Sequence, residues 1–229
     1  GHEVHLYERS PHLGGKWLSS FAPPGREPLR TFLTWLVQSA KRSGVRIHLG
    51  TEVTPELLER AAADEVIMTV GAIPVMPEIP GRDLPHVVTA EQVLMGEATL
   101  GRRVVVAGGG GAGVEVAHFI ATLHQMDRDL EAHLKAFDGY AAIATPLAAT
   151  RREVILVGRN RRLGVGLGPA TRWVLVGELE HDGVTTLPGA TLMAIGPRSV
   201  TIQSGEDGKD TEIAADSVVI CTGYRANEE

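Results

Sequence analysis

Residues 104–115 read Val-Val-Val-Ala-Gly-Gly-Gly-Gly-Ala-Gly-Val-Glu, and this stretch decides the fold of the chain. The apolar residues predict a buried strand, and the glycines lead into a helix whose amino terminus offers N–H groups to phosphate. Gly108, Gly110 and Gly113 have the G-x-G-x-x-G spacing of a dinucleotide site, in which they permit the tight turn, the approach of the pyrophosphate and the close packing of the helix. The predicted nucleotide contacts are Gly108, Gly110, Gly111, Gly113 and Glu115. The alternative for Glu115 is a helix-capping or surface role. The alternative for the motif is a glycine loop that binds no ligand.

The residues after the next predicted strand bear on which dinucleotide binds. The strand at 154–157 is followed by Gly158, where an NAD-binding unit has an acidic residue for the ribose 2′-hydroxyl. A missing carboxylate removes repulsion of a 2′-phosphate, and guanidinium groups bind phosphate well. We therefore predict NADP(H) in preference to NAD(H), bound at its 2′-phosphate by Arg159, Arg161 and Arg162. The alternative is that these three arginines lie on a solvated turn and bind no phosphate.

The amino-terminal residues predict half of a second dinucleotide site. Residues 4–7 form a short strand closed by Glu8, which stands where such a unit has its ribose-binding acid. A glycine turn follows, where a flavoprotein brings its backbone close to a flavin dinucleotide. The predicted FAD contacts are Glu8, Arg9, Gly14, Gly15 and Lys16. The alternative is an ordinary surface glutamate.

Composition excludes several other classes of protein. The 229 residues are 43% apolar and 22% charged, and the net charge is −6 without a dense run of Lys and Arg, so no nucleic-acid partner is expected. No apolar stretch is long enough for a membrane span. The single Cys221 excludes an internal disulfide and a multi-cysteine zinc site, and this usage fits the cytoplasm. The nine histidines show no metal-binding spacing and are interpreted as surface or helix residues.

The alternation of strands and helices predicts an α/β fold with two Rossmann-like lobes, an NAD(P) lobe inserted into an FAD lobe. Two apolar runs, residues 65–70 and 216–221, are expected to be buried strands of the FAD lobe. Each is followed closely by a glycine that lets the backbone approach a flavin, which adds the candidates Thr69, Gly71, Thr222 and Gly223. The expected division is an FAD lobe of residues 1–82 and 212–229, a connection at 83–99, an NAD(P)H lobe at 100–211, and hinges near 79–81 and 214–215.

The order of these features resembles the two-dinucleotide-binding-domain flavoproteins. Among them it is most similar to the carboxyl-terminal region of bacterial 2,4-dienoyl-CoA reductase, enoate reductase and related NADH:flavin oxidoreductases of the Old Yellow Enzyme type. The matching stretches cover nearly the whole chain and include residues 1–8, 13–16, 24–26, 53–54, 69–74, 79–81, 108–115 and 216–223. The Gly-Leu-Gly-x-x-Thr-x-Trp sequence at 166–173 and a long insert at 125–150 point to this group in particular.

This resemblance implies a three-part enzyme, of which the chain is the last part. In that family an N-terminal barrel holds FMN and the substrate site, a cysteine cluster holds a 4Fe-4S centre, and the FAD and NAD(P) domains feed electrons to them. The resemblance also adds Val53 to the cofactor-binding candidates. Both ends of the chain read as truncated within structured elements, because the first FAD glycine loop and the late Gly-Asp segment of the family are absent from it.

The expected function is hydride transfer from NADPH to FAD, which supplies electrons for the reduction of an activated C=C bond in an enoyl or dienoyl substrate. The chain is expected to position the two cofactors and to contribute no catalytic acid or base. One alternative is an NADH-dependent enoate reductase or a relative of the amine dehydrogenases, and another is a degenerate module that binds a nucleotide without catalysis. Cys221 lacks a C-x-x-C partner and is interpreted as a buried packing residue.

Overall fold

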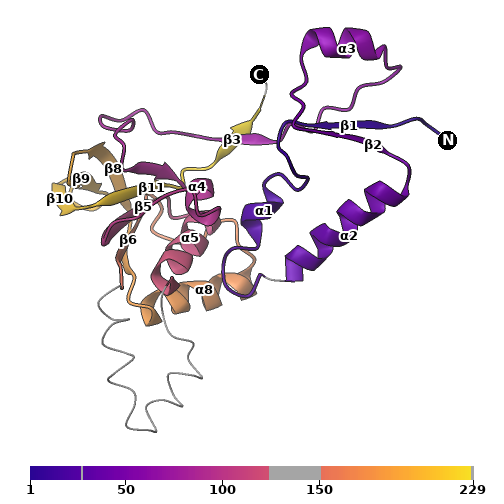
Figure 1. The fold of residues 1–229 in the computed structure, drawn as a ribbon. Helices are drawn as coiled ribbons and strands as arrows, with labels where there is room; N and C mark the ends of the chain where they lie inside the picture. Colours follow the sequence, from indigo (N-terminus) through magenta and orange to yellow (C-terminus); the bar gives the residue numbers. More distant parts are fainter. Residues whose placement is uncertain (27, 124–150, 228–229) are drawn as a thin grey trace, which may run out of the picture. The chain divides into compact units, whose positions relative to one another are not determined.

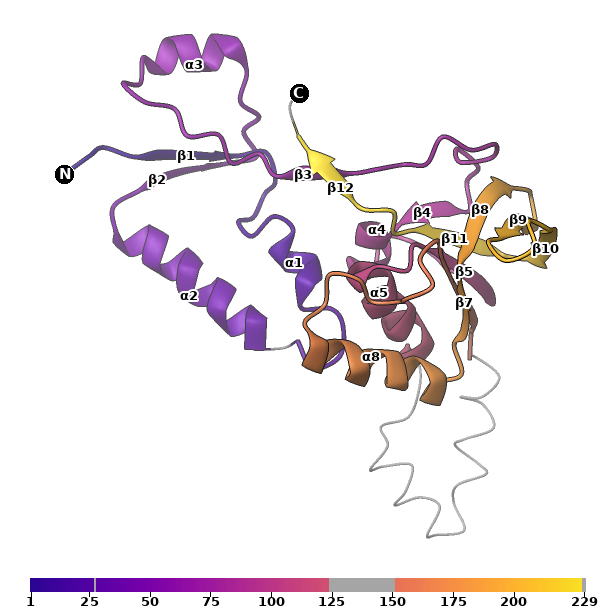
Figure 2. The ribbon, with the colours of Figure 1, turned by 180° about the vertical axis from the view of Figure 1, so that it is seen from behind.

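The computed structural model describes residues 1–26, 28–123 and 151–227, which form two compact units (Figure 1, Figure 2). Unit 1 comprises residues 1–73 and 226–229, and unit 2 comprises residues 74–225. The long insert expected at 125–150 lies outside the described residues. In the described ranges, no helix combines the length and the apolar character that a membrane crossing requires.

Unit 1 is built on a strand–helix–strand crossover. Its strands β1 and β2 pair in parallel, with His5 opposite Arg46 and Glu8 opposite Leu49. In chain order its elements are β1 (His5–Glu8), α1 (Trp17–Ser20), α2 (Pro28–Arg42), β2 (Arg46–Leu49) and α3 (Pro55–Ala61). The predicted strand at 4–7 is confirmed.

The local sequence explains where the helices of unit 1 begin and end. Gly44, just beyond α2, has a φ of +79°, a conformation that glycine adopts without steric cost and that commonly ends a helix. Thr54 caps α3, because its hydroxyl accepts a hydrogen bond from the N–H of Leu57 at 3.3 Å. Pro55 occupies the first turn of α3, where a missing N–H costs nothing.

Unit 2 contains a five-stranded parallel sheet in the order β4-β11-β5-β6-β7 and a three-stranded antiparallel sheet in the order β10-β9-β8. In chain order its elements are β4 (Val87–Thr89), α4 (Ala90–Leu94), β5 (Arg103–Ala107), α5 (Gly111–Thr122), β6 (Glu153–Gly158), α8 (Pro169–His181), β7 (Thr185–Pro188), β8 (Ala190–Ile195), β9 (Ser199–Ser204), β10 (Asp210–Ala214) and β11 (Ser217–Ile220).

The core of unit 2 lies on both faces of the parallel sheet. Successive side chains of a strand point to opposite faces, and β5 is apolar on both. Val104 and Val106 pack with the helices α4, α5 and α8, whereas Val105 and Ala107 pack with β8 and β9. The sheet is therefore covered by helices on one side and by the antiparallel sheet on the other (Figure 2).

Two short strands, β3 (Ala72–Pro74) and β12 (Tyr224–Ala226), carry the chain across the boundary between the units and pair with each other. The N–H of Val75 donates to the carbonyl of Gly223 at 2.9 Å, and the N–H of Asn227 donates to the carbonyl of Gly71 at 3.0 Å. These bonds show that the two segments run in opposite directions. The chain therefore enters and leaves unit 2 side by side.

The expected bounds of the two lobes are wrong, although one unit is inserted into the other as expected, because the chain runs from unit 1 into unit 2 and back. β11 lies in the parallel sheet of unit 2, where Ser217 is opposite Val104 of β5, and β4 flanks it on the other side. Residues 212–225 and 74–99 thus belong to unit 2, and the chain crosses at 73–74 and 225–226 in place of 79–81 and 214–215. Polar contacts fix this pairing, because the N–H of Arg103 donates to the Asp216 carboxylate at 2.9 Å.

The expected strand at 65–70 is also wrong. These residues form no strand and are exposed, and the side chain of Ile67 is 87% exposed. An apolar run becomes a buried strand only when neighbouring strands pair with it, and no described strand pairs with residues 65–70. The strand that does form nearby is β3, which begins after Gly71.

Candidate functional site

The glycine loop lies between β5 and α5, at the carboxyl edge of the parallel sheet. Gly108 has a φ of +136°, and a Cβ there would lie 2.1 Å from the carbonyl oxygen of Cys221. A Cβ on Gly113 would lie 1.6 Å from the carbonyl oxygen of Gly108. Neither position can accept a side chain without a shift of backbone. These two glycines therefore close the turn and pack α5 against the strand, as predicted.

Gly110 differs from these two glycines because space lies beside its Cα. A Cβ on Gly110 would meet only the carbonyl oxygen of Val165, at an ordinary 3.7 Å. Gly110 is also the N-cap of α5, and no side chain caps that helix. The geometry leaves room for a pyrophosphate at the position that the motif predicts, next to a helix amino terminus. The residues present therefore fit a dinucleotide.

A second loop, residues 163–167, packs against the glycine loop. The N–H of Gly164 donates to the carbonyl of Gly109 at 2.8 Å, and the N–H of Gly111 donates to the carbonyl of Val165 at 3.0 Å. The Arg172 side chain of α8 holds this loop in turn, because its Nε donates to the carbonyl of Leu163 at 2.7 Å. The position of the glycine loop is thus fixed by backbone hydrogen bonds.

The residues after β6 lie beside the same loop. Gly158 ends β6, and a Cβ on Gly158 would lie 2.8 Å from the Cα of Gly109. Close packing therefore requires a glycine at position 158. This glycine also means that no carboxylate stands at the expected ribose position. The three predicted arginines follow on an exposed turn: Arg159, Arg161 and Arg162. Arg161 forms an exposed ion pair with Glu206 at 3.4 Å.

The residues after β11 border the glycine loop on its other side. From β5 the chain builds the sheet outward through β6 and β7, and it later returns to form β11 on the other side of β5. The carboxyl ends of β5 and β11 therefore mark the topological switch point where α/β folds bind ligands. Thr222 and Gly223 lie here, so the prediction that they belong to the first lobe is wrong. The Thr222 hydroxyl donates to the carbonyl of Val75.

Cys221 and Glu115 also lie in unit 2. Burial raises the pKa of the Cys221 thiol to about 12, so this thiol is protonated near neutral pH and is no nucleophile. That agrees with its interpretation as a packing residue. Glu115 lies on the second turn of α5 and is half-buried.

The five predicted contacts of the first half-site lie within residues 8–16 of unit 1. Glu8 ends β1, and its carboxylate accepts a hydrogen bond from the N–H of Ser10 at 2.8 Å. Gly14 and Gly15 have φ values of +134° and +49°, and no atom lies within 4 Å of where a Cβ of Gly15 would be. Gly15 therefore presents open backbone to solvent, as a flavin dinucleotide would require. Arg9 and Lys16 flank this turn.

The remaining unit 1 candidates lie apart from that turn in the sequence and are exposed. Val53 is 43% exposed and lies between β2 and α3. Thr69 lies in the exposed segment before β3, and Gly71 follows with a φ of +76°. Their role in binding FAD stays a prediction.

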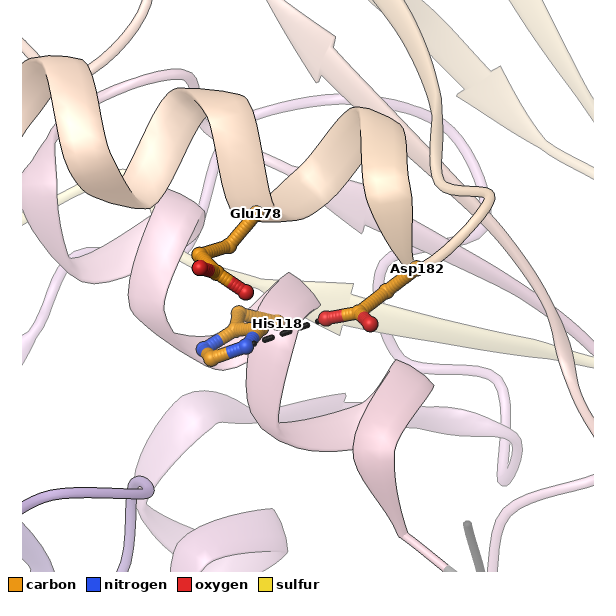
Figure 3. A group of neighbouring side chains, drawn as sticks. All are labelled: His118, Glu178 and Asp182. Carbon is orange, nitrogen blue, oxygen red and sulfur yellow. Dashed lines mark ion pairs between the residues drawn. The ribbon is translucent and has the colours of Figure 1, made fainter. Parts of the chain in front are cut away.

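One cluster of polar side chains in unit 2 was missed by sequence reasoning. His118 of α5 is buried, and its Nε2 lies 3.0 Å from Oδ2 of Asp182, the C-cap residue of α8. Glu178 of α8 points toward the same imidazole (Figure 3). The signal in the sequence was the four-residue spacing of the two carboxylates, which puts them on one helix face. The histidine could not be matched to them without knowing that α5 and α8 are neighbours.

Comparison with known proteins identifies the family. The model of the pyridine nucleotide-disulphide oxidoreductase family matches residues 39–229. The chain is 28% identical to a metal reductase of Desulforamulus reducens over 235 aligned residues, which cover 100% of the chain and 35% of that protein. It is 32% identical to a cinnamate reductase of Clostridium sporogenes over 57% of the chain and 20% of that protein. The chain thus spans about a third or less of the length of these relatives.

The fold agrees with a solved structure of similar architecture. A 2-naphthoyl-CoA reductase superimposes with a TM-score of 0.83 at 21% identity, over 100% of this chain and 30% of that one. This likeness and the family match confirm both the α/β fold class and the resemblance to two-domain flavoproteins.

Proposed function

The chain belongs to the pyridine nucleotide-disulphide oxidoreductase family, and from that premise we propose that it takes hydride from NADPH and passes electrons through FAD to a further redox centre. Family membership makes the chain an oxidoreductase module that binds FAD and NAD(P)H. The family name refers to disulphides, but a chain with one cysteine has no internal redox disulfide. Its electrons therefore go to an acceptor other than its own thiols.

The open backbone at Gly110 is the observation that carries the proposal. It lies at the helix amino terminus and at the switch point of the sheet, so main-chain N–H groups and the helix dipole favour a pyrophosphate there. When bound, the nicotinamide and the flavin supply the hydride-transfer chemistry. The residues of the chain bind the phosphates, orient the nucleotide and limit the access of water.

The choice of NADPH rests on the turn after β6. Gly158 offers no carboxylate to a ribose, and three exposed guanidinium groups follow it. A 2′-phosphate carries a charge that arginine binds through two parallel hydrogen bonds. In unit 1, Glu8 and the open turn at Gly15 support FAD as the second cofactor.

The final acceptor is proposed from the relatives. The names cinnamate reductase and 2-naphthoyl-CoA reductase describe reduction of conjugated organic acids or their thioesters. Because this chain spans a minor share of each, we infer that the substrate site, FMN and a 4Fe-4S centre belong to other parts of the same protein or complex, in the cytoplasm. The substrate class that fits is an activated C=C bond of an enoyl or dienoyl compound.

The Arg159→Ala variant tests the cofactor choice. Loss of a charged hydrogen bond to the 2′-phosphate should weaken NADPH binding about tenfold, and NADH binding should barely change. Isothermal titration of both nucleotides measures this directly and does not require bound FAD. Arg102→Ala is the matched control, because that arginine is also exposed but lies at the opposite edge of the sheet. Equal losses for NADPH and NADH would remove the basis for NADP(H).

A second experiment separates an enzyme from a module that only binds nucleotide. The chain is incubated with FAD under anaerobic conditions, NADPH is added, and the visible absorbance of the flavin is followed. Bleaching that depends on Gly110 supports hydride transfer. Nucleotide binding without bleaching of bound FAD would favour the non-catalytic alternative.

A further inference from the structure

His118, Glu178 and Asp182 bring one imidazole and two carboxylates together between α5 and α8 (Figure 3). One donor atom from each residue lies within 4.8 Å of the other two. His118 is 8% exposed and Asp182 is 5% exposed, whereas Glu178 is half-buried. The three side chains come from two helices that pack on each other, so their convergence is fixed by the fold.

This cluster lies on helices that contribute residues to the apolar core of unit 2. Ala117, Ala121 and Leu179 are sequence neighbours of these residues and belong to the buried core on the helical face of the sheet. Charged groups in such a place require strong compensation, because the low dielectric removes their hydration. A protonated imidazole compensates one carboxylate. A divalent cation compensates both carboxylates and is bound by the imidazole in its neutral form.

We propose that His118, Glu178 and Asp182 form a binding site for a divalent transition-metal ion of the zinc type. Zinc takes histidine nitrogen and carboxylate oxygen ligands at about 2.0–2.2 Å, and three protein ligands with one water complete its usual tetrahedron. At such bond lengths, tetrahedral ligands lie about 3.4 Å apart. The 3.0 Å between His118 and Asp182 is close to this, and rotation of the half-buried Glu178 side chain adjusts the third distance.

The donor set also selects the class of ion. An imidazole ligand favours zinc, cobalt, nickel or copper, whereas magnesium and calcium prefer oxygen ligands alone. Arg151 contributes a positive charge nearby, and its guanidinium donates to the main-chain carbonyl of Asp182 at the end of α8. That contact is directed at the negative end of the helix dipole.

The ion would tie α5, which starts at the glycine loop, to α8, which follows the arginine turn. His118 lies toward the carboxyl end of α5, away from Gly110. The site is therefore separate from the nucleotide site, and the proposed ion would link the two helices. Metal binding should raise the thermal stability of unit 2 because a folded site binds the ion and an unfolded chain does not.

Metal titration of the EDTA-treated chain tests this proposal. Zinc should bind with a stoichiometry of one in calorimetry and raise the melting temperature, and cobalt should give the intense visible absorption of a tetrahedral site. His118→Gln should weaken zinc binding at least about a hundredfold, since it removes a direct ligand. His181→Gln is the matched control, because it removes an exposed histidine one residue from Asp182 on the same helix; its binding should equal that of the wild type.

A variant of the half-buried Glu178 tests the site with less risk of unfolding the protein. Glu178→Gln keeps the size of the side chain and should also lose most zinc affinity while circular dichroism stays unchanged. If the wild type binds no zinc, or if Glu178→Gln and His118→Gln bind it as the wild type does, the cluster is only a buried ion pair and the proposal is wrong. None of these measurements uses NADPH or FAD, so their outcome is independent of the proposed function.

Discussion

Single glycines of the loop between β5 and α5 have separable roles, because an added methyl group would meet different surroundings at each. At Gly113 it would overlap the carbonyl oxygen of Gly108, and at Gly110 it would meet open space. The sequence motif alone predicted the packing role of Gly113 correctly, and the role of Gly110 beside a pyrophosphate stays a prediction. The packing role was predictable because it follows from the local path of a strand–loop–helix unit and needs no knowledge of distant contacts.

We expect Gly110→Ala to abolish nucleotide binding while the fold is retained. The backbone of Gly110 has a φ of −76°, which alanine adopts readily, but its methyl group would occupy the path of the pyrophosphate. Calorimetry should show no measurable binding of NADPH, with an unchanged melting temperature.

Gly113→Ala serves as the comparison, because it should lower the stability of the fold itself. Its methyl group must displace the backbone of the loop, so the melting temperature should fall by several degrees before any nucleotide is added. Unchanged NADPH affinity in Gly110→Ala would mean that the loop is no dinucleotide site, whatever the result at Gly113.

At the scale of secondary-structure elements, helices and the central strand were predictable and the partners of strands were not. The predicted strand before the glycine loop and the predicted helix after it correspond closely to β5 and α5. Runs of β-branched residues and the helical period are local signals. The sequence of residues 216–221 predicts a buried strand but does not indicate which unit contains it. A strand that is buried on both faces is apolar throughout, so its sequence does not identify the neighbouring strands.

The contacts that assign β11 to its sheet come from residues distant in the chain. Asp216 accepts hydrogen bonds from the main-chain N–H and the guanidinium of Arg103, and the Ser217 hydroxyl accepts from the N–H of Gly101 at 2.9 Å. Nothing in the sequence around 216 names Arg103 as its partner. The apolar segment at 65–70 failed as a strand for the related reason that pairing, and not composition, makes a strand.

The pair of Asp216 and Arg103 gives a pH-dependent prediction for Asp216→Asn. Hydrogen bonds from the Arg103 side chain, then from its main-chain N–H, lower the pKa of Asp216 from 3.8 to about 2. A lowered pKa in the folded state stabilises the fold above the unfolded pKa, and this contribution is lost as the pH falls from about 4 to 2. The variant should therefore melt a few degrees below the wild type near neutral pH, and the difference should shrink at acidic pH.

The control for this variant is Asp207→Asn, which changes an exposed turn between β9 and β10. Asp207 Oδ1 accepts a bond from the N–H of Lys209, and asparagine can accept the same bond. Its melting temperature should follow the wild type across the pH range. A constant difference between Asp216→Asn and the wild type down to pH 2 would contradict the assigned role of the carboxylate.

At the scale of the whole molecule, the two units differ in how much of a core they have. Unit 2 has apolar clusters on both faces of its sheet, whereas Pro23 is the sole buried residue among the described residues of unit 1. Burial of apolar surface is the main source of folding free energy, so unit 2 has the means to fold by itself. The boundary at 73–74 and 225–226, and not the predicted one, should therefore define an autonomous fragment.

We expect a fragment of residues 74–225 to unfold cooperatively and to bind NADPH with the affinity of the full chain. It keeps all five strands of the parallel sheet, the glycine loop and the arginine turn. Thermal unfolding by circular dichroism and calorimetric titration measure the two properties.

The matched fragment is residues 100–211, the lobe that the sequence predicted. It lacks β4 and β11, and all four residues of β11 are buried between β4 and β5. Without them, the edge of β5 and the apolar faces of Val105 and Val106 are exposed to water, and Gly108 loses the carbonyl of Cys221 against which it packs. This fragment should not unfold cooperatively and should bind no NADPH. If it proved as stable as residues 74–225, β11 would not be integral to the nucleotide-binding unit, and the boundary drawn from the strand pairing would be wrong.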